Sequence, residues 1–121
     1  MKLAIVGSRD LGGNVEARQL IDAAIDRFKP TEVVSGGAVG IDTMAREAAS
    51  AKGIKVTEFK PAAQRWDGPG GFKERNGQIA DYCDALVRIV SSKVKTYGSG
   101  YTRDRAKERG VQVVAHVVEL P

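Results

Sequence analysis

Three short segments of the chain combine glycine, hydroxyl and charged side chains in a pattern that suits an anionic ligand. They are Gly7-Ser8-Arg9-Asp10, the run Ser35-Gly36-Gly37-Ala38-Val39-Gly40-Ile41-Asp42, and Gly98-Ser99-Gly100-Tyr101-Thr102. Adjacent glycines allow positive φ and leave no Cβ in the way of a ligand. An arginine fork can hold a phosphate through two hydrogen bonds. These segments therefore predict a phosphate-binding site.

The glycine run is the strongest of the three signals. It follows a strand pattern and leads into an amphipathic helix that starts near Gly40. The free N–H groups and the positive end of this helix would face a ligand in the turn. Asp42 would lie in the first turn of the helix, where it either compensates the helix dipole or contacts a ligand hydroxyl.

Arg9, Arg75 and Asn76 extend the predicted site. Arg9 is the first cation after the first strand, and it either pairs with Asp10 or binds phosphate; its place at the strand end favours phosphate. Arg75 opens a helix, where a cation opposes the dipole, so we expect it to serve another task. Asn76 shares the inner face of that helix and either bonds to a neighbouring loop or contacts a ligand.

Two further segments leave alternatives open. The glycine segment before the last helix is either a second anion contact or a flexible connection. Trp66, in an irregular loop from Pro61 to Gly71, either stacks on a base or caps the core. The candidate ligand-binding residues are Gly7, Ser8, Arg9, Ser35, Gly36, Gly37, Gly40, Asp42, Arg75, Asn76, Gly98, Ser99, Gly100 and Thr102.

Motifs for other chemistries are absent from the sequence. There is no Gly-x-Gly-x-x-Gly dinucleotide motif, no P-loop, no Gly-x-Ser-x-Gly elbow and no His-Glu-x-x-His pair. Cys83 is the only cysteine and His116 the only histidine. We therefore expect no metal and no cofactor, and no residue stands out as catalytic.

Alternating strands and amphipathic helices must position these residues. Asn14 is a good N-cap and Gly110 a good helix stop. The pattern predicts an α/β fold: one Rossmann-like three-layer domain over residues 1–121, with a five-stranded, mainly parallel sheet and helices on both faces. The predicted strands cover residues 3–6, 32–35, 54–59, 85–90 and 111–118, and the predicted helices run from Asn14 to Pro30, from Gly40 to Gly53, and over residues 72–83 and 102–109.

Composition and charge fit a small globular protein with an anionic ligand. The 121 residues are 42% hydrophobic and 28% charged, without a run of 18 apolar residues. The N-terminus leads directly into a strand rather than a signal peptide, and with one cysteine we expect a cytoplasmic protein that does not associate with membranes. Residues 52–121 carry a charge of +5 and residues 1–51 carry −1, a balance that suits a nucleotide or nucleic acid.

Together the motifs resemble the SLOG superfamily, whose Rossmann-like domains recognise nucleotides and nucleotide-derived ligands. The resemblance covers nearly the whole chain and includes Phe72, Ile79-Ala80 and Ala106 besides the segments above. The chain is similar to the small YspA-like SLOG proteins, which share the glycine run, the loop tryptophan and the Arg-Asn pair. It is also similar to the Rossmann core of the DNA-processing protein DprA, which binds single-stranded DNA. Because superfamily members often self-associate, the resemblance implies a homo-oligomer, as a dimer.

Three functions follow, in order of preference. The first is binding of a nucleotide or nucleotide-derived phosphate ligand at the carboxyl ends of the strands, and the second is single-stranded DNA binding across the same face. The third is nucleotide N-glycosidic hydrolysis, as in the more distantly similar LOG-type phosphoribohydrolases. Their helix-opening arginine matches Arg75, but Arg105 stands where they carry a glutamate. The sequence therefore does not decide whether the protein is an enzyme. Val39 stands where DprA-like relatives carry an arginine, so the resemblance implies a weaker hold on phosphate.

Overall fold

The computed structural model describes residues 1–95 and 97–121 and places strands and helices in alternation. Each strand after the first is reached through a helix, which is the connection that parallel strands require. In chain order the elements are β1 (Lys2–Gly7), the 3-10 turn η1 (Arg9–Leu11), α1 (Val15–Phe28), β2 (Glu32–Ser35), α2 (Ile41–Ala51), β3 (Lys55–Glu58), α3 (Phe72–Tyr82), β4 (Ala85–Ser91), α4 (Tyr97–Glu108) and β5 (Gln112–Val118).

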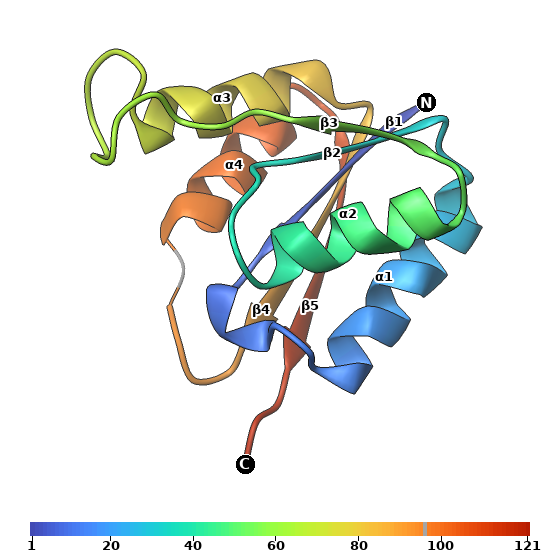
Figure 1. The fold of residues 1–121 in the computed structure, drawn as a ribbon. Coiled ribbons are helices and arrows are strands. Elements are labelled where there is room, and N and C mark those ends of the chain that lie inside the picture. Colours follow the sequence, from blue (N-terminus) through green and yellow to red (C-terminus); the bar gives the residue numbers. More distant parts are fainter. Residues whose placement is uncertain (96) are drawn as a thin grey trace.

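The five strands form one parallel sheet in the order β3-β2-β1-β4-β5. The chain runs outward from β1 to β3, then crosses over the sheet and continues on the other side of β1 with β4 and β5. Figure 1 shows α1 and α2 on one face of the sheet and α3 and α4 on the other. The predicted Rossmann-like fold is thus confirmed. Its strand order reverses between β1 and β4, where such folds hold their ligands.

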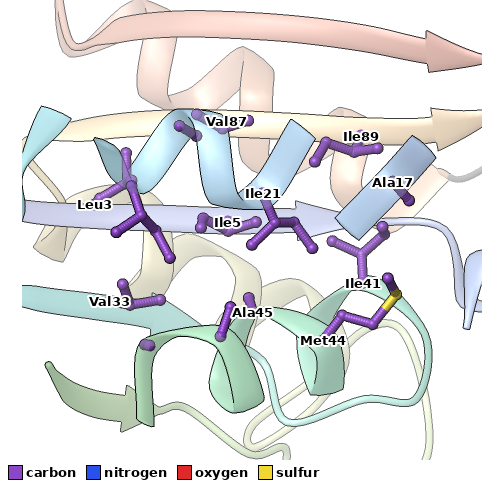
Figure 2. Close-up of a cluster of buried hydrophobic side chains, with 14 of the residues drawn as sticks. Leu3, Ile5, Ala17, Ile21, Val33, Ile41, Met44, Ala45, Val87 and Ile89 are labelled. Carbon is purple, nitrogen blue, oxygen red and sulfur yellow. The ribbon is translucent and has the colours of Figure 1, made fainter. Parts of the chain in front are cut away.

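The central strand β1 is buried on both faces because its side chains alternate between two apolar layers. Leu3 and Ile5 pack under α1 and α2, beside Ile21, as Figure 2 shows. Ala4 and Val6 face the layer of α3 and α4. Each fully buried Leu or Ile stabilises the fold by roughly 1.5–3 kcal/mol. This packing fixes the end of β1, where the predicted site begins.

Local signals set several element ends as the sequence predicts. The Asn14 side chain accepts a hydrogen bond from the Ala17 N–H at 2.9 Å and caps α1. Lys29 ends α1 in the left-handed region, with φ of 47°. Gly110 follows α4 with φ of +76°, which suits a glycine stop.

The start of α4 differs from the prediction. The helix begins at Tyr97, not at Thr102, so the five residues 97–101, which precede the predicted helix, lie in its first turns. Thr96, which belongs to the same predicted loop, lies outside the described residues. The Gly98 carbonyl accepts hydrogen bonds from Thr102 and from Asn76 of α3. These contacts and packing against α3 outweigh the low helix propensity of glycine.

In the described part of the chain, no helix combines the length and hydrophobicity needed to cross a bilayer.

Candidate functional site

A pocket of about 400 Å³ lies beyond the carboxyl ends of β1 and β4. Its volume falls in the range of roughly 300–1,000 Å³ that small-molecule sites occupy. Residues from β1, η1, the glycine turn after β2, α3 and α4 surround it. Its lining consists of Val6, Gly7, Arg9, Asp10, Ala38, Asp42, Trp66, Phe72, Arg75, Asn76, Ile79, Val94, Lys95, Gly98, Ser99 and Thr102.

The peptide of Gly36 is held on both sides by charged side chains. Its N–H donates to Oδ2 of Asp42 at 3.2 Å, and its carbonyl accepts from Nη1 of Arg75 at 2.6 Å. The N–H of Ala38 donates to the same Asp42 oxygen at 3.2 Å. Two N–H groups of the turn that the sequence assigns to a ligand phosphate are therefore bound by the protein's own carboxylate.

Glycine is required at two positions of this turn. A Cβ on Gly36 would lie 2.6 Å from Nη1 of Arg75, so a side chain there would displace the arginine. Gly40 has φ of +81°, and its Cβ would lie 2.5 Å from the carbonyl oxygen of Ser8. The glycines thus serve close packing of the turn against α3 and η1.

Asp42 is the buried carboxylate of the pocket, only 7% exposed. Burial raises its pKa to about 6, although the Ala38 N–H, the Arg75 charge and the Gly36 N–H all favour the ionised form. Both backbone bonds go to Oδ2, so Oδ1 has no hydrogen-bond partner among the described residues. Asp42 therefore offers the pocket one acceptor oxygen, and near pH 7 it is mostly ionised.

Arg75 and Asn76 tie α3 to both neighbouring elements. Nε of Arg75 donates to Oδ1 of Asn76 at 2.7 Å, and Nδ2 of Asn76 donates to the Gly98 carbonyl at 3.2 Å. The Arg75 guanidinium also binds the Phe59 carbonyl. Burial lowers the Arg75 pKa, and Asp42 partly offsets this. Its Nη2 makes no hydrogen bond within the described chain, so this corner of the fork remains for a ligand.

Arg9 and Lys95 bring two exposed cations to the pocket from η1 and from the segment after β4. Neither side chain forms an ion pair or a hydrogen bond with another residue that the structure describes. Arg9 in particular does not pair with Asp10. Both cations are therefore available to an anion.

Eight of the fourteen predicted residues line the pocket, and the others lie behind or beside it. Ser8 is fully buried, and its hydroxyl accepts the Ser91 N–H at 2.9 Å. Ser35 is also buried, and its Oγ has no partner among the described residues. Gly100 lines a neighbouring groove instead. The predicted residues that do not line the pocket are Ser8, Ser35, Gly36, Gly37, Gly40 and Gly100.

Several lining residues were not among the candidates. Lys95 and Val94 belong to the polar segment after β4, and the two lysines there could have indicated a cationic edge. Phe72 and Trp66 supply the aromatic walls. The Trp66 and Tyr101 rings meet edge to face at 5.6 Å, with Trp66 38% exposed, so Trp66 lies at the rim and not in the core.

Comparisons with known proteins agree with this architecture. The X-ray structure of DNA processing protein A (DprA) from Streptococcus pneumoniae is similar to this chain, with a TM-score of 0.72 and 26% sequence identity. The match covers 94% of this chain and 49% of that one, so the chain spans about half the length of that protein. No curated protein matches the sequence.

A sequence profile described as DNA recombination-mediator protein A matches residues 1–61. This half of the chain contains β1, η1, the glycine turn and Asp42, which form one side of the pocket. The chain belongs to the DNA recombination-mediator protein A family.

Proposed function

We propose that the pocket binds a nucleotide, with the phosphate at the cations of its mouth and the sugar toward Asp42. The observation that carries the proposal is the distribution of unpartnered polar atoms around one pocket of about 400 Å³. Arg9 and Lys95 are exposed cations, whereas Oδ1 of Asp42 is a buried acceptor. A phosphorylated sugar presents the matching groups, an anion and hydroxyl donors.

The carboxylate of Asp42 determines where the phosphate lies. A phosphate beside the ionised carboxylate would be repelled, and the N–H groups of Gly36 and Ala38 already bond to that carboxylate. The phosphate is therefore placed at Arg9 and Lys95, and Nη2 of Arg75 is left for a sugar or base oxygen. Phe72 and Trp66 offer apolar surface to the base.

Single-stranded DNA is the second candidate ligand, in which the bound nucleotide is one unit of a strand. Two observations favour it: the family is that of DNA recombination-mediator protein A, and the pocket opens past Trp66 into a groove with further cations. A strand would place successive phosphates along this edge of the sheet.

Calorimetric titration of the intact chain with dTMP tests the proposal. Arg9→Gln removes one charge-assisted contact to the phosphate, so we expect the dissociation constant to rise about tenfold. Arg46→Gln removes an equivalent charge from the exposed face of α2, away from the pocket, and should bind as the native chain does. The melting temperatures of both variants should match that of the native protein.

Two outcomes decide between the candidates. If dTMP produces no heat, but short oligo-dT binds and Arg9→Gln weakens that binding, single-stranded DNA replaces a mononucleotide as the proposed ligand. If neither ligand binds to the folded protein, or if Arg9→Gln and Arg46→Gln behave alike, the assignment of the pocket is wrong.

A further inference from the structure

A second hollow of about 1080 Å³ adjoins the pocket on the other side of Trp66; we call it the α4 groove. It lies between the carboxyl end of β4 and the outer face of α4. It shares Trp66, Val94 and Lys95 with the pocket, so the two form one continuous surface. The rest of its lining is Arg88, Val90, Ser91, Ser92, Lys93, Gly100, Tyr101, Arg103 and Asp104.

The α4 groove is strongly cationic. Four of its lining residues are Lys or Arg and only one, Asp104, is acidic. Arg88 projects from β4 toward α4, where its Nε donates to the Ser99 hydroxyl at 3.0 Å. Burial lowers the pKa of Arg88, and the charge of Arg103 lowers it further while Asp104 partly compensates. Two like charges are thus held near each other in a partly desolvated place, an arrangement that an anion stabilises.

Arg103 is only partly buried. Its Nε bonds to Oδ1 of Asp104 at 2.9 Å, and its side chain is 30% exposed. Asp104 itself is 62% exposed, so this ion pair is weak and can yield to a better acceptor. A phosphate, which accepts two parallel bonds from a guanidinium, is such an acceptor.

Aromatic rings separate the pocket from the α4 groove. Trp66 borders both, and its ring meets that of Tyr101 edge to face. A ligand that extends from one hollow to the other passes this pair, where Trp66, which is 38% exposed, offers ring surface for stacking.

We propose that the α4 groove is a second phosphate subsite, with Arg103 and Arg88 as its anchors, for a ligand whose first phosphate lies at the mouth of the pocket. This inference rests on the proposed nucleotide-binding function and deepens it, because it requires a ligand that carries one phosphate on each side of a stacked group. The second phosphate is either a diester in a short strand or the 3′-phosphate of a nucleoside 3′,5′-bisphosphate, since in both a nucleoside separates it from the first.

Quenching of Trp66 fluorescence is the direct assay, because Trp66 is the only tryptophan of the chain and borders both hollows. The ligands are dTMP, the 5′-phosphorylated dinucleotide pdTpdT, and thymidine 3′,5′-bisphosphate. We expect pdTpdT or thymidine 3′,5′-bisphosphate to bind about tenfold more tightly than dTMP, as one extra charge-assisted contact allows. A gain for pdTpdT alone identifies a strand as the source of the second phosphate, and a gain for the bisphosphate shows that a single nucleotide supplies it.

Arg103→Gln should reduce the affinity for the two-phosphate ligand to that for dTMP, without changing the affinity for dTMP itself. Lys107→Gln removes a charge from the exposed part of the same helix outside the groove and serves as the matched control. If Arg103→Gln fails to fold, Lys93→Gln, in the exposed segment after β4, provides the same comparison.

The outcomes separate this inference from the proposed function. Binding of dTMP that Arg9→Gln weakens, with equal affinity for all three ligands, overturns the second subsite and leaves the pocket intact. A two-phosphate ligand that binds tightly to Arg103→Gln and Lys93→Gln also overturns it. If no ligand quenches Trp66 and calorimetry detects no binding, both proposals fail.

Discussion

Asp42 affects both the stability of the protein and its proposed ligand binding. Its carboxylate is nearly buried and holds the glycine turn through the Gly36 and Ala38 N–H groups, yet burial raises its pKa to about 6. A carboxylate with a raised pKa is ionised at a cost in the folded state. The unfolding free energy therefore falls as the pH rises from about 3.8, the ordinary pKa of an aspartate, to about 6, the pKa of Asp42 in the folded protein. Above this window Asp42 is ionised in both states, and the full cost of its buried charge lowers the stability.

Asp42→Asn should stabilise the protein near neutral pH. The amide oxygen can still accept from Gly36 and Ala38, while the buried charge is gone, so we expect a gain on the order of 1–3 kcal/mol at about pH 7.5. The gain should shrink toward pH 4, where Asp42 is protonated in the native chain. Urea unfolding at both pH values measures the difference, and Asp10→Asn, at an exposed carboxylate of the same pocket, is the control. Lower stability of Asp42→Asn at pH 7.5 would contradict the assigned pKa.

The turn between β2 and α2 positions the site because it packs against η1. The Ile41 N–H donates to the Ser8 carbonyl at 3.2 Å, and the positive φ of Gly40 lets the turn approach η1 without a side chain in between. This contact brings Asp42 of α2 and Arg9 of η1 to the same pocket. The geometry of the site thus depends on how two connections fit together.

Gly40→Ala and Gly53→Ala separate close packing from backbone strain. Both glycines have positive φ, but a Cβ on Gly53 has no atom within 4 Å, whereas a Cβ on Gly40 would lie 2.6 Å from Cα of Arg9. We expect Gly53→Ala to cost about 1 kcal/mol, which is the strain of positive φ. Gly40→Ala should cost about 3 kcal/mol or more, because η1 must also move. If urea unfolding gives equal losses of unfolding free energy for the two variants, the turn is not closely packed against η1.

At the scale of the whole molecule, one edge of the sheet gathers several cations. Cations from η1, β4, the segment after it and α4 all border the pocket or the α4 groove. They come from distant parts of the sequence, and parallel strands collect them because all their carboxyl ends lie at the same edge. The basic excess of residues 52–121 contributes most of them.

Binding of short oligo-dT should therefore weaken steeply with added salt. A strand whose phosphates contact three cations would give a slope of about −2 in log affinity against log salt, at about 0.7 per phosphate for single strands. Trp66 fluorescence titrations between about 50 and 200 mM salt measure this slope. Arg103→Gln should reduce it by about 0.7, whereas Lys107→Gln should leave it unchanged. A slope near zero would exclude a strand along this edge.

Much of the fold was predictable because it depends on local signals. Asn14 caps α1 as expected, and the bounds of β2 agree residue for residue with the strand predicted over 32–35. The alternation of strands and helices determines a parallel sheet, and a parallel sheet places the loops after its strands at one edge. The sequence alone thus brought Arg9, Asp42 and Arg75 into one predicted site, and the pocket contains all three.

Only the tertiary structure decided how those residues are used. The sequence assigns the glycine turn to a phosphate, but its N–H groups at Gly36 and Ala38 bond to Asp42, six and four residues away. The carbonyl of Gly36 accepts a hydrogen bond from Arg75, 39 residues away. The glycine segment 98–100 forms the start of α4, where the Gly98 carbonyl is bound by Asn76 of α3. Residue type and spacing tell which groups can bond. Which partner each group takes depends on long-range packing, since a buried polar atom bonds to whatever the fold brings within reach.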